Sequence, residues 1–189
     1  MKKRILTLVL ITVLTVTSLL ACSKDEPKEP GMTKVVLSEV AHSIFYAPMY
    51  VAIEEGYFAE EGIDLNLVTA FGADKVMTAV LSGEADIGFM GSESSIYTYN
   101  EGATDYVVNF AQLTQRAGNF LVAREKMADF NWEDLKGTNV LGGRKGGMPQ
   151  MVFEYILKKN NIDPTTDLEI NQNIDFGSTA AAFSEGQGD

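Results

Sequence analysis

The strongest constraint on the fold is a regular alternation of strand-like and helix-like segments, separated by short loops that contain glycine. Residues 63–67 alternate apolar and polar side chains, as a half-buried strand does. Residues 73–82 instead place apolar side chains four positions apart and stop at Gly83, as an amphipathic helix does. Strands that alternate with helices through short loops predict an α/β fold with doubly wound parallel sheets.

The same patterns continue along the chain. They predict strands at 35–37, 63–67, 86–90, 107–113, 120–123, 139–141 and 168–171. They predict helices at 47–56, 73–82, 94–100, 148–160 and 179–185, and a short helix with Asn131 as its N-cap. We expect either Ser92 or Ser94 to cap the helix at 94–100. In sheets of this kind a ligand binds outside the carboxyl ends of the strands, so we expect the ligand contacts to lie in the loops there.

The first 21 residues have the order of a secretory signal peptide. Three basic residues, 2–4, precede an apolar run, 5–20, that is shorter than the roughly 20 residues of a membrane-spanning helix. The run ends in a small residue, Ala21, followed by Cys22, which resembles the lipobox of bacterial lipoproteins; an uncleaved anchor helix is the alternative. In a lipobox the cysteine is lipidated and the bond before it is cut. We therefore expect an exported protein anchored by lipid to the outer face of the cell membrane.

Composition excludes several classes of function. The formal net charge is −11 and no basic stripe is present, which argues against binding nucleic acid or anionic lipid. Cys22 is the only cysteine and His42 the only histidine, so no disulfide framework, thiol–histidine pair or Cys/His metal site can form. We expect no catalytic residue, no metal and no cofactor.

Four phrases of the sequence carry a family resemblance. They are Glu55–Leu65 (EGYFAEEGIDL), Leu81–Gly88 (LSGEADIG), Asp134–Gly137 (DLKG) and Gly146–Pro149 (GGMP). Taken together and in this order, they resemble the substrate-binding proteins of ABC importers, in the branch for thiamine-pyrimidine precursors, aliphatic sulfonates and nitrate. The resemblance extends over about residues 34–189.

The resemblance implies a periplasmic-binding-protein-like fold of two α/β lobes that close around a ligand. Lobe one is expected at 34–114, the hinge crossing at 115–118 and lobe two at 119–189, behind a charged, proline-containing tether at 22–33. Because members of the family continue well beyond this length, lobe two is expected to be incomplete. The implied function is capture of a small nutrient and its delivery to an ABC permease.

Two loops of lobe one supply candidate ligand contacts. The loop after the first strand carries His42, Phe45 and Tyr46, which can hydrogen-bond to a planar ligand and stack on it. Ser92 follows another strand and opens a helix, where a hydroxyl and backbone N–H groups can hold an anion or a carbonyl. Each has a structural alternative: a surface histidine, packed aromatic rings and a helix cap.

Two arginines are the candidates for binding an anionic ligand. Arg144 lies in the glycine loop at 142–147, which matches neither the Walker motif nor the dinucleotide fingerprint. Arg116 lies beside the predicted hinge. Either guanidinium can clamp a carboxylate, sulfonate or phosphate, or can be a solvated loop charge.

The sequence is also compatible with two other functions. The resemblance includes a pyrimidine synthase of thiamine biosynthesis, although that enzyme carries a cysteine-rich motif that this chain lacks. A lipoprotein that senses a ligand for a membrane kinase is the other. Ligand class is also open between a heterocycle held by Tyr46, Phe45 and His42 and a small anion held by Arg116 or Arg144.

Overall fold

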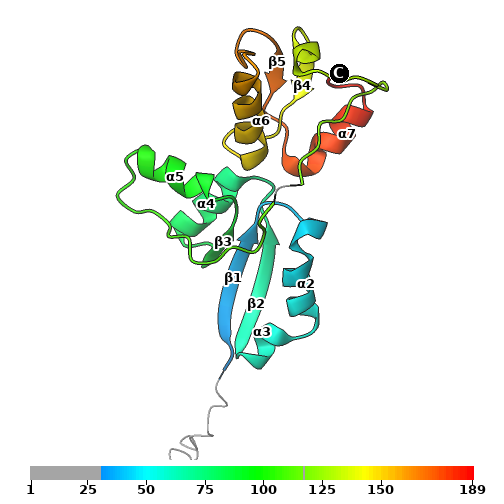
Figure 1. The fold of residues 1–189 in the computed structure, drawn as a ribbon. Helices are drawn as coiled ribbons and strands as arrows, with labels where there is room; N and C mark the ends of the chain where they lie inside the picture. The colour runs from blue at the N-terminus through cyan, green and yellow to red at the C-terminus, as the bar shows by residue number, and fades with distance from the viewer. Residues whose placement is uncertain (1–30, 117) are drawn as a thin grey trace, which may run out of the picture. The chain divides into compact units, whose positions relative to one another are not determined.

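The computed structural model describes residues 31–116 and 118–189. The predicted signal peptide, the predicted lipidation site Cys22 and nearly all of the predicted tether lie outside the described residues. Strands and helices alternate along the described part, and every strand pairing is parallel, which confirms the α/β fold (Figure 1). Within those two ranges no helix combines the length and apolar character that crossing a bilayer requires.

The first sheet has three parallel strands in the order β2-β1-β3. Its strands are β1 (Thr33–Glu39), β2 (Ile63–Thr69) and β3 (Ile87–Phe89). Its helices are η1 (Ile44–Tyr46), α2 (Ala47–Glu54), α3 (Tyr57–Glu60), α4 (Ala73–Ser82) and α5 (Glu93–Asn100). The register pairs Glu39 with both Thr69 and Phe89, so the carboxyl ends of all three strands meet at one edge.

The second sheet has two parallel strands, β4 (Asn139–Leu141) and β5 (Glu169–Asn171). Its helices are η2 (Trp132–Leu135), α6 (Met148–Lys159), η3 (Phe176–Ser178) and α7 (Thr179–Ser184). Asn131 caps η2 in a capping box with Asp134, as the sequence predicts. Both sheets belong to one compact unit, Thr33–Asp189.

Each sheet has its own apolar core. Val40, Ala73 and Val76 form the buried core of the first sheet. Leu135, Leu157, Ile162 and Leu168 form that of the second, with Trp132 packed against them.

Helix α4 approaches the first sheet closely because residue 88 on β3 is a glycine. A Cβ atom at Gly88 would lie only 3.0 Å from side-chain carbons of Val76 and Val80. Helix α4 therefore depends on the small residue at position 88 for its close packing.

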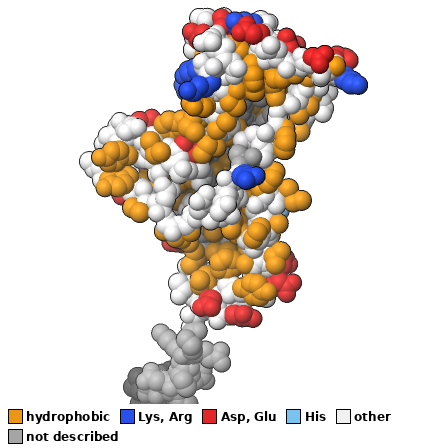
Figure 2. All heavy atoms as spheres, viewed as in Figure 1, with side chains coloured by type: hydrophobic (Ala, Val, Ile, Leu, Met, Phe, Trp, Pro, Cys, Tyr) orange, Lys and Arg blue, Asp and Glu red, His pale blue; other side chains and the backbone are white. Residues whose placement is uncertain are grey.

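The predicted strands at 107–113 and 120–123 are wrong, because the structure has no strand at either place. Their apolar side chains are exposed instead: Phe110 is 78% exposed and Phe120 is 82% exposed. An apolar sequence cannot become a strand without a neighbouring strand to satisfy its backbone, and no described strand pairs with either segment. Apolar surface is accordingly prominent on the face that Figure 2 shows.

The predicted helix at 47–56 is confirmed, with Gly56 just past its end as expected, and an extra helix follows it. Helix α2 ends at Glu54, and α3 begins directly after Gly56. Gly56 adopts a φ of 79°, which favours glycine, and this turns the chain between the two helices.

Candidate functional site

The candidate site lies at the carboxyl ends of the parallel strands. The loop after β1 carries His42 and Tyr46, and the loop after β3 leads to Ser92. The loop after β4 carries Arg144. Because all strands within each sheet run in the same direction, these loops gather where parallel sheets commonly bind ligands.

Glu39, the last residue of β1, organises this edge of the first sheet. Its side chain is completely buried, yet both carboxylate oxygens accept hydrogen bonds. Oε1 accepts from the Thr69 hydroxyl at 2.8 Å and lies 3.2 Å from Nδ1 of His42. Oε2 accepts from the Tyr50 hydroxyl at 2.7 Å. These bonds offset the cost of burying a carboxylate, and they fix the loop that follows β1.

Tyr50 connects Glu39 to the loop that follows β1. Its hydroxyl accepts a hydrogen bond from the backbone N–H of Ser43 at 3.0 Å, and its ring stacks on the ring of His42 with centroids 4.2 Å apart. Burial and the hydrogen bond to Glu39 raise the pKa of Tyr50 to about 12. The His42 side chain is 69% exposed but held in place on one face, so it presents a fixed polar edge.

The two aromatic candidates of the loop differ in their surroundings. Tyr46 is half-buried and meets the ring of Phe89 edge-on, with centroids 4.4 Å apart. Burial raises the pKa of Tyr46, and the negative charges of Glu39 and Glu93 raise it further. Phe45 is 49% exposed, and its ring lies so close to Gly118 that a Cβ atom there would overlap it.

The serines expected to cap α5 do not do so. Ser92 occupies the N-cap position, but its side chain makes no capping hydrogen bond, and its backbone is already helical. The hydroxyl of Ser94 is buried without a hydrogen-bond partner among residues 31–116 and 118–189. A side-chain cap needs an extended N-cap backbone to aim its oxygen at the helix amides, and Ser92 lacks that conformation. Ser92 is exposed and stays a predicted ligand contact.

Glu93, at the start of α5, is the least satisfied polar group at this edge. It is 3% exposed, and in the described part of the chain neither of its carboxylate oxygens has a hydrogen-bond partner. Burial raises its pKa, and the nearby amides of Glu93 and Met148 offset part of that rise. The carboxylate folds back over Gly91, where a Cβ atom would overlap it.

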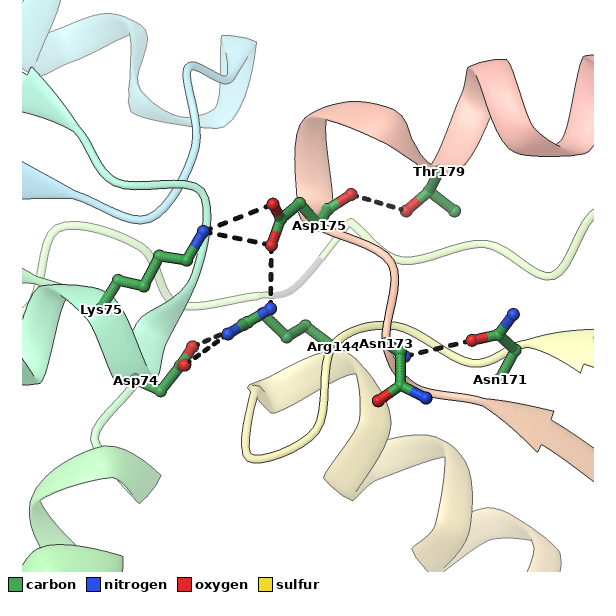
Figure 3. Close-up of polar contacts among 7 residues, drawn as sticks. All are labelled: Asp74, Lys75, Arg144, Asn171, Asn173, Asp175 and Thr179. Carbon is green, nitrogen blue, oxygen red and sulfur yellow. Dashed lines mark hydrogen bonds and ion pairs between the residues drawn. The ribbon is translucent and has the colours of Figure 1, made fainter.

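Arg144 is already engaged by two carboxylates (Figure 3). Its guanidinium makes two hydrogen bonds of 2.7 Å to Asp74 at the start of α4 and one of 2.8 Å to Asp175 before η3. Asp175 also accepts from the Lys75 ammonium at 3.2 Å. The bond from Arg144 is the largest cause that lowers the pKa of Asp74. Arg144 and Arg116, which is exposed, stay predicted anion contacts.

Sequence patterns missed the acidic side chains of this region. Glu39 ends an apolar strand, and Glu93 follows a strand and a glycine. A carboxylate at the end of a buried strand was the signal that could have singled out Glu39. The pairing of Asp74 and Asp175 with Arg144 joins residues 70 and 31 positions apart, and no local pattern predicts such a contact.

Comparison with known proteins identifies the family. The model of the family described as "NMT1/THI5 like" matches residues 44–189, more than half of the chain. The chain belongs to the NMT1/THI5-like family. It is also 54% identical, over 172 residues, to the "Putative binding protein YtlA" of Bacillus subtilis (strain 168). That alignment covers 91% of this chain and 50% of YtlA, so the chain spans about half the length of this relative.

Solved structures show the same fold at lower identity. A protein from Bordetella bronchiseptica RB50 matches with a TM-score of 0.60 and 23% identity, over 83% of this chain and 49% of that chain. The periplasmic aliphatic sulphonate binding protein SsuA from Escherichia coli matches at 0.54 and 16%, over 82% and 51%. The alkanesulfonate-binding protein SsuA from Xanthomonas axonopodis pv. citri, bound to MOPS, matches at 0.55 and 15%, over 83% and 53%. The fold is therefore the one that periplasmic binding proteins use, and the chain spans about half of it.

Proposed function

We propose that this chain is the solute-binding component of an ABC importer, an exported lipoprotein that captures a small nutrient and hands it to the permease. The observation that carries the proposal is its 54% identity to a relative named as a binding protein. The two sulfonate-binding proteins have the same class of activity on the same fold.

The geometry supports binding by two lobes that share one ligand. We propose lobe one at 34–114, a hinge crossing at 115–118 and lobe two at 119–189. Lobe one brings Tyr46, His42 and Ser92 to one edge, and lobe two brings the loop of Arg144. Closure in such a protein is driven by contacts that the ligand makes only when both lobes enclose it.

The relatives favour binding over catalysis, because those with a named activity are binding proteins. Nδ1 of His42 lies against the Glu39 carboxylate and its ring stacks on Tyr50, so the imidazole has a fixed orientation from which it can contact a ligand. Burial raises the pKa of Tyr46, so its phenol stays protonated and can stack on a ligand or donate a hydrogen bond to it. We therefore propose a non-enzymatic role, outside the cytoplasm, with the lipid on Cys22 as the anchor.

A thermal-shift screen of the full chain tests the proposal. A panel of amino heterocycles, sulfonates and other small anions is added to the wild type and to Tyr46→Ala. At least one solute is expected to raise the wild-type melting temperature, because a ligand that binds only the folded state stabilises it, and to do so less in the variant. A panel in which no compound shifts the wild type would contradict solute binding.

Import and sensing differ in their consequence for the cell. Deletion of the gene should abolish uptake of the radiolabelled solute if the protein delivers it to a permease. Normal uptake together with a lost transcriptional response to the same solute would instead favour the sensing role.

A further inference from the structure

A contact between two distant segments joins the halves of the chain that carry the two sheets. The first segment is the loop after β2, residues 70–75, which leads into α4. The second is the turn after β5, residues 175–177, which opens η3. Lys75 and Asp175 meet across 100 positions of sequence, so the tertiary fold and no local pattern creates this contact.

Four charged side chains alternate in sign across the contact (Figure 3). Asp74 and Lys75 come from the start of α4, and Arg144 and Asp175 come from the loops of the second sheet. Arg144 donates to both oxygens of Asp74, each at 2.7 Å, and Lys75 donates to Asp175 at 3.2 Å. Arg144 also donates to Asp175 at 2.8 Å, which links the two pairs. Each side therefore presents one positive and one negative charge, placed so that opposite signs meet.

Apolar contacts lie beside the charges. Phe176 belongs to the turn after β5 but packs, half-buried, against the apolar core of the first sheet. The ring of Phe71 covers Gly177, where a Cβ atom would lie only 2.9 Å from it. Phe71 has a φ of 58°, a backbone conformation that a bulky side chain rarely adopts. Residues of this kind persist where surrounding contacts hold them and are common in clamps and switches, and here the contact comes from the other half of the chain.

Glycine at position 72 leaves room for the ion pair. A Cβ atom at Gly72 would lie 2.6 Å from Oδ1 of Asp74 and 2.9 Å from Nε of Arg144. The φ of Gly72 is 177°, which any residue adopts, so the backbone does not require glycine here. The space that the guanidinium and the carboxylate occupy does require it.

We propose that these segments form a latch that holds the two proposed lobes together when no ligand is bound. The latch consists of residues 70–75 on the first-lobe side, and of Arg144 with residues 175–177 on the second-lobe side. It rests on the proposed two-lobed, solute-binding function and adds control of access, because the lobes must break the latch before a solute can enter between them. Its charged side chains are partly exposed, so rising ionic strength should weaken it.

Exchange of charges across the latch tests it without a ligand. Asp74→Lys with Lys75→Asp keeps the composition and the net charge, but places like charges against Arg144 and Asp175. Arg144→Asp with Asp175→Arg does the same from the other side. The quadruple variant, with all four substitutions, restores opposite signs at every contact. Its recovery would separate pairing across the latch from any effect of one substitution within its own half.

Amide hydrogen exchange of the full chain, followed by mass spectrometry, measures both sides of the latch. The Val76 amide donates to the Gly72 carbonyl and the Ser178 amide to the Asp175 carbonyl, so both segments are bordered by hydrogen-bonded amides. Peptides that span these amides should exchange about fivefold faster in each double variant and at the wild-type rate in the quadruple variant. Hydroxyl-radical labelling of Phe176 should rise in the double variants alone, since separation of the segments uncovers its ring.

Salt should act with opposite sign on the two kinds of protein. About 0.5 M NaCl should speed exchange at both segments in the wild type, because it screens attraction, and slow it in the double variants, because it screens repulsion. The matched control exchanges Glu125→Lys with Lys126→Glu. These exposed neighbours make no ion pair within the ranges 31–116 and 118–189, so the control should behave as the wild type does.

Three results would overturn the latch. Double variants that exchange at the wild-type rate would show that the charges do not hold the segments together. A quadruple variant as fast as the double variants would show that each side chain acts within its own half. A wild-type rate that salt leaves unchanged would do so even if a double variant failed to fold. Each of these outcomes leaves solute binding standing, whereas a blank thermal-shift screen would remove solute binding and leave the contact in place.

Discussion

Tyr50 donates its hydroxyl proton to Glu39 across 2.7 Å and so joins helix α2 to the end of strand β1. The same hydroxyl accepts from the Ser43 amide, so one oxygen connects the strand, the loop and the helix. The shape of the loop with His42 and Tyr46 therefore depends on a hydrogen bond that lies behind it.

Removal of that hydroxyl should destabilise the protein. Tyr50→Phe keeps the ring stacked on His42 but leaves a buried Glu39 oxygen without its donor, which should lower the free energy of unfolding by about 1–3 kcal/mol. Urea denaturation followed by circular dichroism measures the change. Tyr57→Phe, at a 53% exposed ring, is the matched control and should be neutral. Equal stability of the two variants would show that the Tyr50–Glu39 bond contributes nothing net.

The Tyr50–Glu39 bond also predicts a dependence on alkaline pH. The pKa of Tyr50 is raised from 10.0 to about 12 in the folded protein, so folding favours the neutral phenol. Its contribution is complete below the unfolded pKa and is lost as pH rises through the folded value. The stability advantage of wild type over Tyr50→Phe should thus shrink between about pH 10 and about pH 12. An advantage that stays constant across that window would mean that the phenol titrates normally.

Tyr46 should contribute directly to ligand affinity. Tyr46→Ala removes a stacking face and should weaken binding of the cognate solute by about 1–3 kcal/mol. Calorimetry on the wild type and the variant measures it. Tyr99→Ala, on α5, is a suitable control because its ring is 63% exposed. A Tyr46→Ala protein that binds within threefold of the wild type would place the ligand on other loops.

Replacement of Arg144 should distinguish a role in stability from a role in ligand binding. Arg144→Ala breaks partly exposed ion pairs with Asp74 and Asp175, which water still screens, and should lower stability by only about 1 kcal/mol. It should weaken ligand binding as much as Tyr46→Ala does only if the ligand is anionic, because only then is a charge-assisted bond lost. Calorimetry with the cognate solute measures the second effect, and Arg116→Ala serves as the comparison. An affinity loss with a cationic ligand would contradict this reasoning.

Cys22 should be required for lipid attachment. Cys22→Ser is expected to accumulate as an unprocessed precursor, because the lipid is attached to the cysteine sulfur of the lipobox. Metabolic labelling with a fatty acid and immunoblotting measure both effects. A variant that is still labelled and still matures would contradict the lipoprotein assignment.

Amide hydrogen exchange should be slower in residues 34–114 than in residues 118–189. Residues 118–189 carry only a two-stranded sheet in the described structure, whereas 34–114 carry three paired strands, so slow amides should concentrate in the first half. The largely exposed segments at 106–116 and 118–130 should exchange fastest, since they lie outside both sheets. Mass spectrometry of peptide fragments measures the rates, and uniform strong protection across both halves would contradict the prediction.

Local sequence patterns predicted helices best, because a helix makes its backbone hydrogen bonds within its own segment. Helices α4 and α6 appear at or within one residue of their predicted bounds, because amphipathic spacing and end signals such as Gly83 and Pro149 act within the helix. The strand at 107–113 failed for the opposite reason. Its residues have the right character, but a strand exists only when another strand supplies hydrogen bonds, and sequence pattern does not reveal whether that partner is present.

The candidate site was predictable only in part. Parallel topology predicts that ligand contacts follow the strands, which is why His42, Tyr46, Ser92 and Arg144 were the candidates. Their partners could not be chosen: Glu39 meets Thr69 across 30 positions, and Arg144 meets Asp74 across 70. Contacts between residues so far apart are set by the tertiary fold. The carboxylates that pair with His42 and Arg144 thus could not be predicted from local sequence.

The only tryptophan, Trp132, packs against the core of the second sheet, while six of the seven tyrosines lie in residues 34–114. The two proposed lobes thus carry different natural fluorophores. Emission excited selectively through the indole reports on the second half alone, and tyrosine absorbance reports mainly on the first. Unfolding of each half can therefore be followed optically in the unmodified chain, without labels or added tryptophans.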